Sequence, residues 1–207
     1  MPGTTPGRVL AVEGVEGAGK STLLRGLASR LEEERIPVLS FREPGGTDLG
    51  ERVREILLHG HSDLSAETEL FLFMSSRSQL VRERILPAVA GGTTVVLDRY
   101  LLSSVAYQGG AGGLGIQTVV DIGRIAVKGA EPDLSIILDL ESEEGLSRLS
   151  GGSLDRIESK GLDYHRKVRR AYIDAAALYP WPVTVIPAAQ APGKVLDDAW
   201  EAVRALF

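Results

Sequence analysis

Cysteine is absent from this chain of 207 residues, which excludes disulfide bonds and thiolate metal sites. Histidine is also scarce: His59, His61 and His165 lack the spacing of a metal site and are expected to be exposed to solvent. No apolar run approaches the ~18 residues of a membrane-spanning helix. Residues 1–7 have no apolar core of the kind found in a signal peptide, and are expected to form a flexible tail. We therefore expect a cytoplasmic protein without membrane contact.

Basic residues do not outnumber acidic ones. The chain has 23 Lys and Arg against 28 Asp and Glu, a formal net charge of −5. Proteins that bind nucleic-acid polymers usually carry a clustered basic footprint, so we expect no nucleic acid as a partner. Small anions remain possible ligands, because single arginines can bind them. Hydrophobic residues make up 43% of the chain, which is ordinary for a globular protein, and the length predicts one domain over residues 8–207.

A glycine-rich stretch after the apolar run Val9–Val12 has the spacing Gly-x4-Gly-Lys-Ser of a phosphate-binding P-loop. Glycines let backbone N–H groups converge on phosphate oxygens, and the N-terminus of the following helix favours negative charge. Lys20 would reach the β- and γ-phosphates, and Ser21 could bind Mg²⁺. A chance glycine turn is the alternative, but the apolar run before it and the helical pattern after it favour the P-loop. The predicted ATP-binding residues are Gly14, Val15, Glu16, Gly17, Ala18, Gly19, Lys20, Ser21 and Thr22.

Apolar runs alternate with helical patterns along the whole chain, which predicts an α/β fold with a five-stranded parallel sheet and helices on both faces. The predicted strands span residues 8–13, 38–41, 93–97, 134–138 and 182–186. Predicted helices span about residues 20–35, 49–58, 65–90, 116–128 and 192–207, with two further helical segments flanking residues 151–153. Loops are expected at residues 42–47 and 108–115, both rich in glycine.

The third predicted strand ends in an acid, in the form of a Walker B motif. Four apolar or β-branched residues precede Asp98, which could therefore hold Mg²⁺ beside the P-loop. The alternative is an ordinary turn residue at the end of a strand. Arg99 follows directly, and the planar fork of its guanidinium suits a pair of phosphate oxygens better than a lysine would. Its alternative is a surface arginine.

Five blocks of sequence together resemble thymidylate kinase of the bacterial type. They are the P-loop, Arg42–Thr47, Asp98–Tyr100, Ala106–Gly110 and Leu154–Glu158. The blocks occur in the family's order between residue 8 and about residue 190, and Glu-Pro-Gly-Gly-Thr and Tyr-Gln-Gly-Gly are more specific than the P-loop. The resemblance implies a P-loop nucleoside monophosphate kinase fold with a short lid. It also implies ATP as phosphoryl donor, deoxythymidine monophosphate (dTMP) as acceptor, Mg²⁺ as cofactor, and a homodimer formed through faces of the long helix.

The resemblance assigns two residues to the thymine base. Phe73 and Arg77 match the family's base-binding pair, and their spacing puts both on one face of the long helix. Phe73 would stack on the base, although a core position is the alternative reading, and Arg77 would donate to an exocyclic oxygen. Ser104 and Gln108 match positions near the base edge.

Three more residues are assigned to the sugar and phosphate of dTMP. Glu16 matches the carboxylate that binds the 3′-hydroxyl, and a carboxylate inside a phosphate-binding loop favours such a specific role. Tyr107 matches the aromatic residue that crowds the 2′ position and so favours deoxyribose. Arg99 is expected to face the phosphate groups.

The lid, about residues 148–160, departs from the family pattern because Ser150–Ser153 separates two arginines. Lid closure would bring Arg156 or Arg148 to the transferred group, so both are candidate catalytic residues beside Lys20 and Arg99. We predict that Arg156 acts on the transition state and that Arg148 holds ATP, and the alternative is that the two arginines exchange these roles. The alternative for Arg156 is an ion pair with a neighbouring acid in the lid. The predicted metal residues are Ser21, Asp98 and Glu43, the last of which matches the family's acidic loop residue.

Two other functions remain open at this point. Another nucleoside monophosphate or deoxynucleoside kinase of the same fold would lack the Phe73 and Arg77 pair or the crowding by Tyr107. A non-kinase P-loop ATPase or switch would hydrolyse ATP without an acceptor and would need a partner protein.

Overall fold

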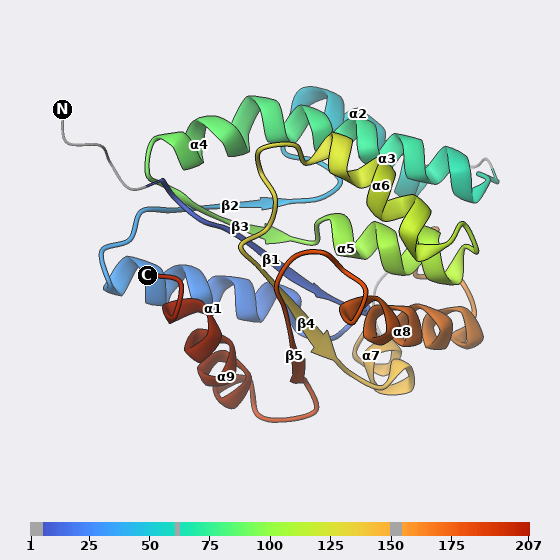
Figure 1. Ribbon diagram of the computed structural model, residues 1–207. Helices are drawn as coiled ribbons and strands as arrows, with labels where there is room; N and C mark the ends of the chain where they lie inside the picture. The colour runs from blue at the N-terminus through green and yellow to red at the C-terminus, as the bar shows by residue number, and fades with distance from the viewer. Residues whose placement is uncertain (1–5, 61–62, 150–154) are drawn as a thin grey trace.

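Five parallel strands form the centre of the computed structural model, which describes residues 6–60, 63–149 and 155–207. The strands are β1 (Val9–Gly14), β2 (Val38–Arg42), β3 (Thr94–Asp98), β4 (Leu134–Asp139) and β5 (Val183–Pro187), in the spatial order β2-β3-β1-β4-β5 (Figure 1). The predicted strands are confirmed, with ends that differ by at most one residue. Their carboxyl ends all lie at the same edge of the sheet.

The middle of the sheet is apolar because it is covered on both faces. Every residue of β1 is buried, and β3 and β4 are buried over nearly their whole length. The edge strands β2 and β5 have several exposed positions. Continuous apolar runs in central strands are typical of parallel sheets between two helical layers.

Helices cover both faces of the sheet (Figure 1). Helices α1 and α9 lie together on one face, and α3, α4 and α6 lie on the other. The described helices are α1 (Lys20–Glu33), α2 (Asp48–His59), α3 (Ala66–Leu80), α4 (Leu86–Ala90), α5 (Leu101–Ser104), α6 (Ile116–Ala126), α7 (Ser142–Arg148), α8 (Leu162–Ala176) and α9 (Pro192–Arg204). Two π-helical segments, η1 (Val81–Ile85) and η2 (Val105–Ala111), join α3 to α4 and extend α5.

The long helix predicted over residues 65–90 is continuous but not uniform. Its middle widens into η1 before the chain returns to α-helical geometry in α4. Pro87 lies in the first turn of α4, and Ile85 and Leu86 before it keep helical backbone angles. The chain therefore keeps one helical direction through a proline.

The predicted loop over residues 108–115 is wrong in its first half, because residues 108–111 belong to η2. Gly110 serves close packing here, because a Cβ at Gly110 would lie 2.2 Å from the Cβ of Ala171 on α8. Helix α8 can therefore approach η2 closely at this point. The glycines that suggested a loop instead mark a contact between two helical segments.

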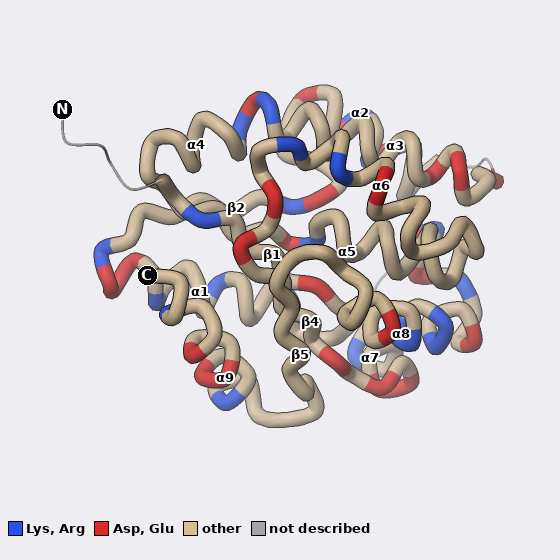
Figure 2. The backbone as a smooth tube through the Cα atoms, viewed as in Figure 1, with Lys and Arg blue, Asp and Glu red and all other residues tan. Residues whose placement is uncertain are grey.

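Residues 6 and 7, which the sequence placed in a flexible tail, are among the described residues. Residues 1–5 lie outside the described residues, but the Gly7 N–H donates a hydrogen bond to the Val89 carbonyl over 2.9 Å. A Cβ at Gly7 would lie 2.0 Å from the carbonyl oxygen of Thr93, so this residue packs tightly against the start of β3. In the described ranges, no helix combines the length and the apolar character that crossing a membrane needs. Acidic and basic residues are interspersed along the helices (Figure 2).

Candidate active site

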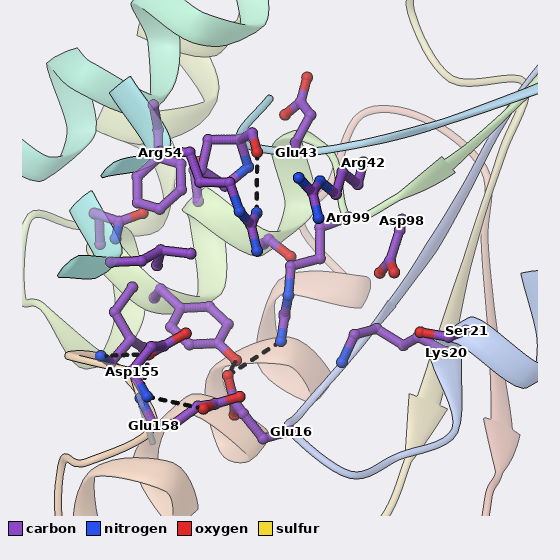
Figure 3. A pocket seen from close by; sticks show the side chains of 18 of the residues that line it. Glu16, Lys20, Ser21, Arg42, Glu43, Arg54, Asp98, Arg99, Asp155 and Glu158 are labelled. Carbon is purple, nitrogen blue, oxygen red and sulfur yellow. Dashed lines mark hydrogen bonds and ion pairs between the residues drawn. The ribbon is translucent and has the colours of Figure 1, made fainter. Parts of the chain in front are cut away.

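A pocket of about 320 Å³ opens at the carboxyl edge of the sheet, where β1 and β3 end (Figure 3). Open parallel sheets bind ligands at this edge, where neighbouring connections run to opposite faces. Most of the predicted site residues line this pocket. They are Glu16, Gly17, Lys20, Ser21, Glu43, Phe73, Asp98, Arg99, Ser104, Tyr107 and Gln108. Arg77, Arg148 and Arg156 do not line it.

The P-loop connects the end of β1 to the start of α1. Gly19 takes a left-handed conformation with φ of 94° directly before the helix, which an L side chain would adopt only at a cost. Gly17 lies against α7, because a Cβ there would be 2.0 Å from the Gly145 carbonyl oxygen. A Cβ on Gly145 would in turn lie 2.3 Å from the Glu16 carbonyl oxygen. The P-loop and α7 thus touch backbone to backbone.

Lys20 folds back onto the P-loop. Its Nζ donates to the carbonyl oxygens of Gly14 and Val15 over 3.2 and 2.8 Å. Burial lowers the pKa of Lys20 to about 7, and the nearby Arg99 acts in the same direction. A bound phosphate would reverse this effect, because an anion favours the charged amine.

Arg99 lies at the centre of the pocket wall, in a left-handed conformation with φ of 66°. Its guanidinium donates to the Gly14 carbonyl over 3.0 Å and to Glu16 Oε1 over 3.1 Å, and it lies 5.1 Å from the centre of the Tyr107 ring. In Figure 3, the side chains of Lys20 and Arg99 point toward the same space, between Glu16 and Asp98. Two cations therefore converge on the region where phosphates are expected.

Glu16 holds its charge although it is buried. Burial by itself would raise the pKa of Glu16, but contacts with His165, Arg99 and Lys20, and a hydrogen bond from Tyr107, together hold that pKa well below its usual range. The Tyr107 hydroxyl donates to Glu16 Oε1 over 2.5 Å. An ionised carboxylate at this place is a strong acceptor for a ligand hydroxyl.

The end of the pocket at which the thymine base is predicted to bind, called the base end below, is formed by α3, α5 and η2. Phe73, Ser104 and Gln108 line it, and the Gln108 side-chain amide donates to Glu69 over 3.1 Å. The other side-chain atom of that amide, Gln108 Oε1, is buried and has no hydrogen-bond partner among the described residues. Phe73 is partly exposed, so it is not a core residue alone.

Arg77 lies beneath this wall and is 1% exposed. Its Nε and Nη2 contact Glu43 Oε2, and Nη2 also donates to the Tyr100 carbonyl. Nη1 donates to Ser104 Oγ over 3.0 Å and lies 3.3 Å from Met74 Sδ. A guanidinium has five N–H groups, and these five contacts occupy all of them.

The predicted metal residues Ser21, Asp98 and Glu43 all line the pocket. Burial raises the pKa of Glu43 to about 7 despite the ion pair with Arg77, and Glu43 Oε1 is buried without a hydrogen-bond partner among the described residues. No cluster of three acidic or imidazole side chains able to hold a metal by itself occurs in residues 6–60, 63–149 and 155–207. Hydroxyl and carboxylate oxygens fit Mg²⁺, which commonly binds through one or two carboxylates together with substrate phosphates.

The two lid arginines lie in different places. Arg148 donates to the Gly17 carbonyl over 3.2 Å and pairs with Glu144. A second pocket of about 500 Å³ shares Gly17 with the first and is lined by Ala18, Gly19, Thr22, Arg148, Gln190 and Pro192, among others. Residues 150–154 of the lid, with Ser150–Ser153, lie outside the described residues.

Arg156 is attached to the base end of the first pocket. Its Nη1 lies 2.8 Å from Glu69 Oε1, and its Nε donates to the Leu57 carbonyl over 2.8 Å. Among the described residues its carboxylate partner is thus Glu69, not the adjacent acids of the lid. In this conformation Arg156 is not brought together with Lys20.

The expectation that His165 is solvated is wrong. His165 is 1% exposed, and its Nδ1 lies 3.2 Å from Glu16 Oε2. His59 is exposed as expected, and His61 lies outside the described residues. The sequence held one signal: His165 and Tyr172 are seven residues apart, which is two turns of α8, so both lie on the face that packs on η2.

Two further charged residues, one behind the pocket wall and one lining the pocket, were also missed. Glu13 is fully buried at the end of β1, where it accepts hydrogen bonds from the Tyr100 N–H and from Ser103 Oγ. Burial raises the pKa of Glu13. An acid in an otherwise apolar strand, directly before the P-loop, was the available signal. Arg54 lines the pocket from α2 and donates to the Pro44 carbonyl, but nothing in its local pattern separates it from the surface arginines beside it.

Fold and pockets together define a P-loop nucleoside monophosphate kinase, with one pocket on each side of the phosphate-binding loop. A family model described as thymidylate kinase matches residues 12–199. The chain therefore belongs to the thymidylate kinase family. A thymidylate kinase of Thermoanaerobacter sp. (strain X514) is 41% identical over 198 residues, which cover 96% of this chain and 98% of the relative. Another, from Caldanaerobacter subterraneus subsp. tengcongensis, is 42% identical over 174 residues, 84% of each chain.

Proposed function

We propose that this protein transfers the γ-phosphoryl group of ATP to dTMP, giving dTDP and ADP, in the synthesis of dTTP. The observation that carries the proposal is the cluster of Glu16, Tyr107 and Arg99 in the pocket beside Lys20. Next to the phosphate-binding loop, the carboxylate of Glu16 would bind a sugar hydroxyl and the ring of Tyr107 would contact the face of the sugar. The guanidinium of Arg99 would bind a phosphate group. The family membership of the chain supports the same reaction.

The reaction needs little proton chemistry. A phosphate oxygen of dTMP is already ionised and forms the new bond to the γ-phosphorus, while the bond from that phosphorus to the β,γ-bridging oxygen of ATP breaks. Catalysis then consists of alignment and charge compensation. Lys20 would act on the transferred group, and Arg99 and Arg54 would hold the acceptor phosphate from two sides.

Mg²⁺ belongs to this proposal as the cofactor that neutralises charge on the donor phosphates. Ser21 and Asp98 would hold it, since the hydroxyl and the carboxylate both line the pocket next to Lys20. Glu43 would help through its unpartnered Oε1, which is the atom of its carboxylate that Arg77 leaves free.

ATP would lie on the other side of the P-loop, with its adenine in the second pocket. Arg148 supports this placement because it lines that pocket and touches the P-loop at Gly17. The role of Arg156 in the transition state stays a prediction, and it requires that Arg156 leave Glu69 when the lid closes.

The thymine base would stack on Phe73 at the base end of the first pocket. Because Arg77 already has partners for its N–H groups, donation to the base requires that it exchange one of them. Gln108 and Ser104 remain beside the base edge. A single domain over residues 8–207, a homodimer and a cytoplasmic location also stay predictions.

A coupled kinase assay with a panel of acceptors tests the function. It compares deoxythymidine, deoxyuridine, uridine, cytidine, adenosine and guanosine monophosphates. The methyl group that distinguishes thymine from uracil contributes only ~1–3 kcal/mol to the discrimination between the two substrates. Deoxyuridine monophosphate should therefore be a poorer but real substrate. Cytidine nucleotides should be rejected more strongly, because an amino donor replaces the carbonyl that Arg77 would contact. Equal efficiency with cytidine and thymidine forms would contradict this role of Arg77, and ATP hydrolysis without any acceptor dependence would contradict the kinase.

A further inference from the structure

Helix α8 brings one histidine into direct contact with the P-loop carboxylate. His165 is 1% exposed, and its Nδ1 lies 3.2 Å from Oε2 of Glu16. The other ring nitrogen, Nε2, lies 3.2 Å from the carbonyl oxygen of Glu158. Glu158 belongs to the segment of residues 155–159, which forms part of the pocket wall across from the P-loop (Figure 3).

The two contacts decide where the protons of the imidazole lie. A carbonyl oxygen can only accept, so the contact with Glu158 requires the proton on Nε2. If that were the only proton, the lone pair of Nδ1 would face a carboxylate oxygen. Both Nδ1 and Glu16 Oε2 are buried, and neither has a hydrogen-bond partner elsewhere in the part of the chain that the structure describes. A second proton on Nδ1 removes this conflict and makes an ion pair.

The surroundings favour the same state. The contact with Glu16 raises the pKa of His165, against the opposing effect of burial. The titratable or charged groups that face the pair include Arg99, Lys20, Tyr107 and Tyr172 on the side of Glu16, and Tyr164 and Lys160 on the side of His165. The carboxylate of Glu158 accepts a hydrogen bond from the Asp155 N–H over 3.0 Å, and Glu158 contacts His165 through its backbone carbonyl. Glu16 is thus the acid that the imidazole meets.

We propose that His165, as an imidazolium, is a positioning residue for the acceptor nucleotide: it orients Glu16 toward the sugar hydroxyl and links that carboxylate to residues 155–159. This inference rests on the proposed function, in which Glu16 binds the 3′-hydroxyl of dTMP. Tyr107 and Arg99 both hold Oε1 of the carboxylate, so the contact from His165 fixes its second oxygen. When the pH rises and the imidazolium loses its proton, Glu16 loses this support. The KM for dTMP should then rise while kcat changes little.

Three variants separate the charge of His165 from its shape. His165→Asn keeps an N–H donor near the position of Nδ1 but cannot ionise, and His165→Phe keeps a ring without any N–H. His59→Asn is the matched control, because His59 is exposed on α2. His165→Phe should raise the KM for dTMP on the order of 10-fold at pH 6, with kcat within about 3-fold of wild type. The ratio of wild-type to His165→Asn KM should rise on the order of 10-fold between pH 6 and pH 9. This ratio cancels the titration of Lys20 and of the ligand phosphate, which both proteins share.

An acceptor without the 3′-hydroxyl shows whether His165 acts through Glu16. The KM for 3′-deoxythymidine monophosphate should be the same in wild type and His165→Phe, because this acceptor has no hydroxyl for Glu16 to bind. An equal rise in KM for both acceptors would overturn the inference and leave His165 a packing residue. A wild-type protein without dTMP-dependent turnover would instead refute the proposed function.

A titration of the histidine rings tests the ion pair without any assay of activity. The chain has three histidines, so NMR signals of the full-length protein can be assigned with the single variants. The pKa of His165 should lie above the ordinary 6.5 in wild type and should fall in Glu16→Gln. A pKa at or below 6.5 that does not change in Glu16→Gln would overturn the inference, even if His165→Phe fails to fold.

Discussion

Arg77 and Glu43 form an ion pair that is closed to solvent: the Arg77 Nε donates to Glu43 Oε2 over 2.7 Å, and the two side chains are 1% and 2% exposed. Removing one partner of such a pair leaves an uncompensated buried charge. Arg77→Met should therefore lower the free energy of unfolding by about 3–5 kcal/mol at pH 8.

The decrease in the free energy of unfolding caused by Arg77→Met should be smaller at pH 5 than at pH 8. The raised pKa of Glu43, about 7, means that the folded protein takes up this proton more readily than the unfolded chain. At pH 5 the buried carboxyl can be neutral, so it no longer needs its partner. Urea unfolding at both pH values, with the double variant Arg77→Met/Glu43→Gln as control, checks this prediction. A loss that is equal at the two pH values would show that Glu43 is not the cause.

Lys20→Met should remove most phosphoryl transfer and leave the fold intact. Loss of a group that stabilises the transition-state charge costs about 10²–10³-fold in kcat. At pH 6 the variant should be no less stable than wild type, because the depressed pKa of Lys20 means that its charge opposes folding below pH 7. Turnover and thermal unfolding at pH 6 measure both effects. A folded Lys20→Met protein with near wild-type turnover would refute the P-loop assignment.

Tyr107 should control the choice between deoxyribose and ribose through its ring. Tyr107→Phe keeps the ring, so the preference for dTMP over ribothymidine monophosphate should persist, while the KM rises because Glu16 loses a hydrogen bond of 2.5 Å. Tyr107→Ala should relax the preference. Tyr179→Phe is a matched control, since the Tyr179 hydroxyl has no hydrogen-bond partner among the described residues. An unchanged sugar preference in Tyr107→Ala would move the discrimination to Glu16.

The two lid arginines should differ in the kinetic constant that they affect. Arg148→Ala should raise the KM for ATP, because Arg148 lines the second pocket. Arg156→Ala should lower kcat by on the order of 10²-fold if Arg156 leaves Glu69 to act on the transition state. Arg170→Ala is the control, since Arg170 pairs on the surface with Asp174. A rise in the KM for dTMP alone would mean that Arg156 only holds the base end of the pocket through Glu69.

The sheet and the phosphate-binding loop could be predicted because their signals are local. Residues Val9–Lys20 contain a β-strand, a glycine-rich turn and the first residue of a helix. These three features can be recognised without reference to any distant residue. The same holds for Asp98, which follows an apolar strand directly. Parallel strands then place both motifs at one edge of the sheet.

The partners within the site could not be predicted in the same way. His165 reaches Glu16 from a helix that is distant in the sequence, and Arg77 meets Glu43 across 34 positions. Such contacts depend on how helices pack on the sheet, which a single sequence does not encode locally. Gly110 is a further example, because the sequence alone does not distinguish a glycine that permits close packing of two helices from a glycine that forms a loop.

The close backbone contact between Gly17 and Gly145 restricts the design of chimeras in which the P-loop or α7 is exchanged with that of a relative. Each position excludes even a methyl group, because the backbone of the P-loop and the backbone of α7 occupy the space on either side. A substitution on one side cannot be compensated by a smaller residue on the other, since both are already the smallest. A chimera that takes α7 or the P-loop from a relative must therefore have glycine at both positions.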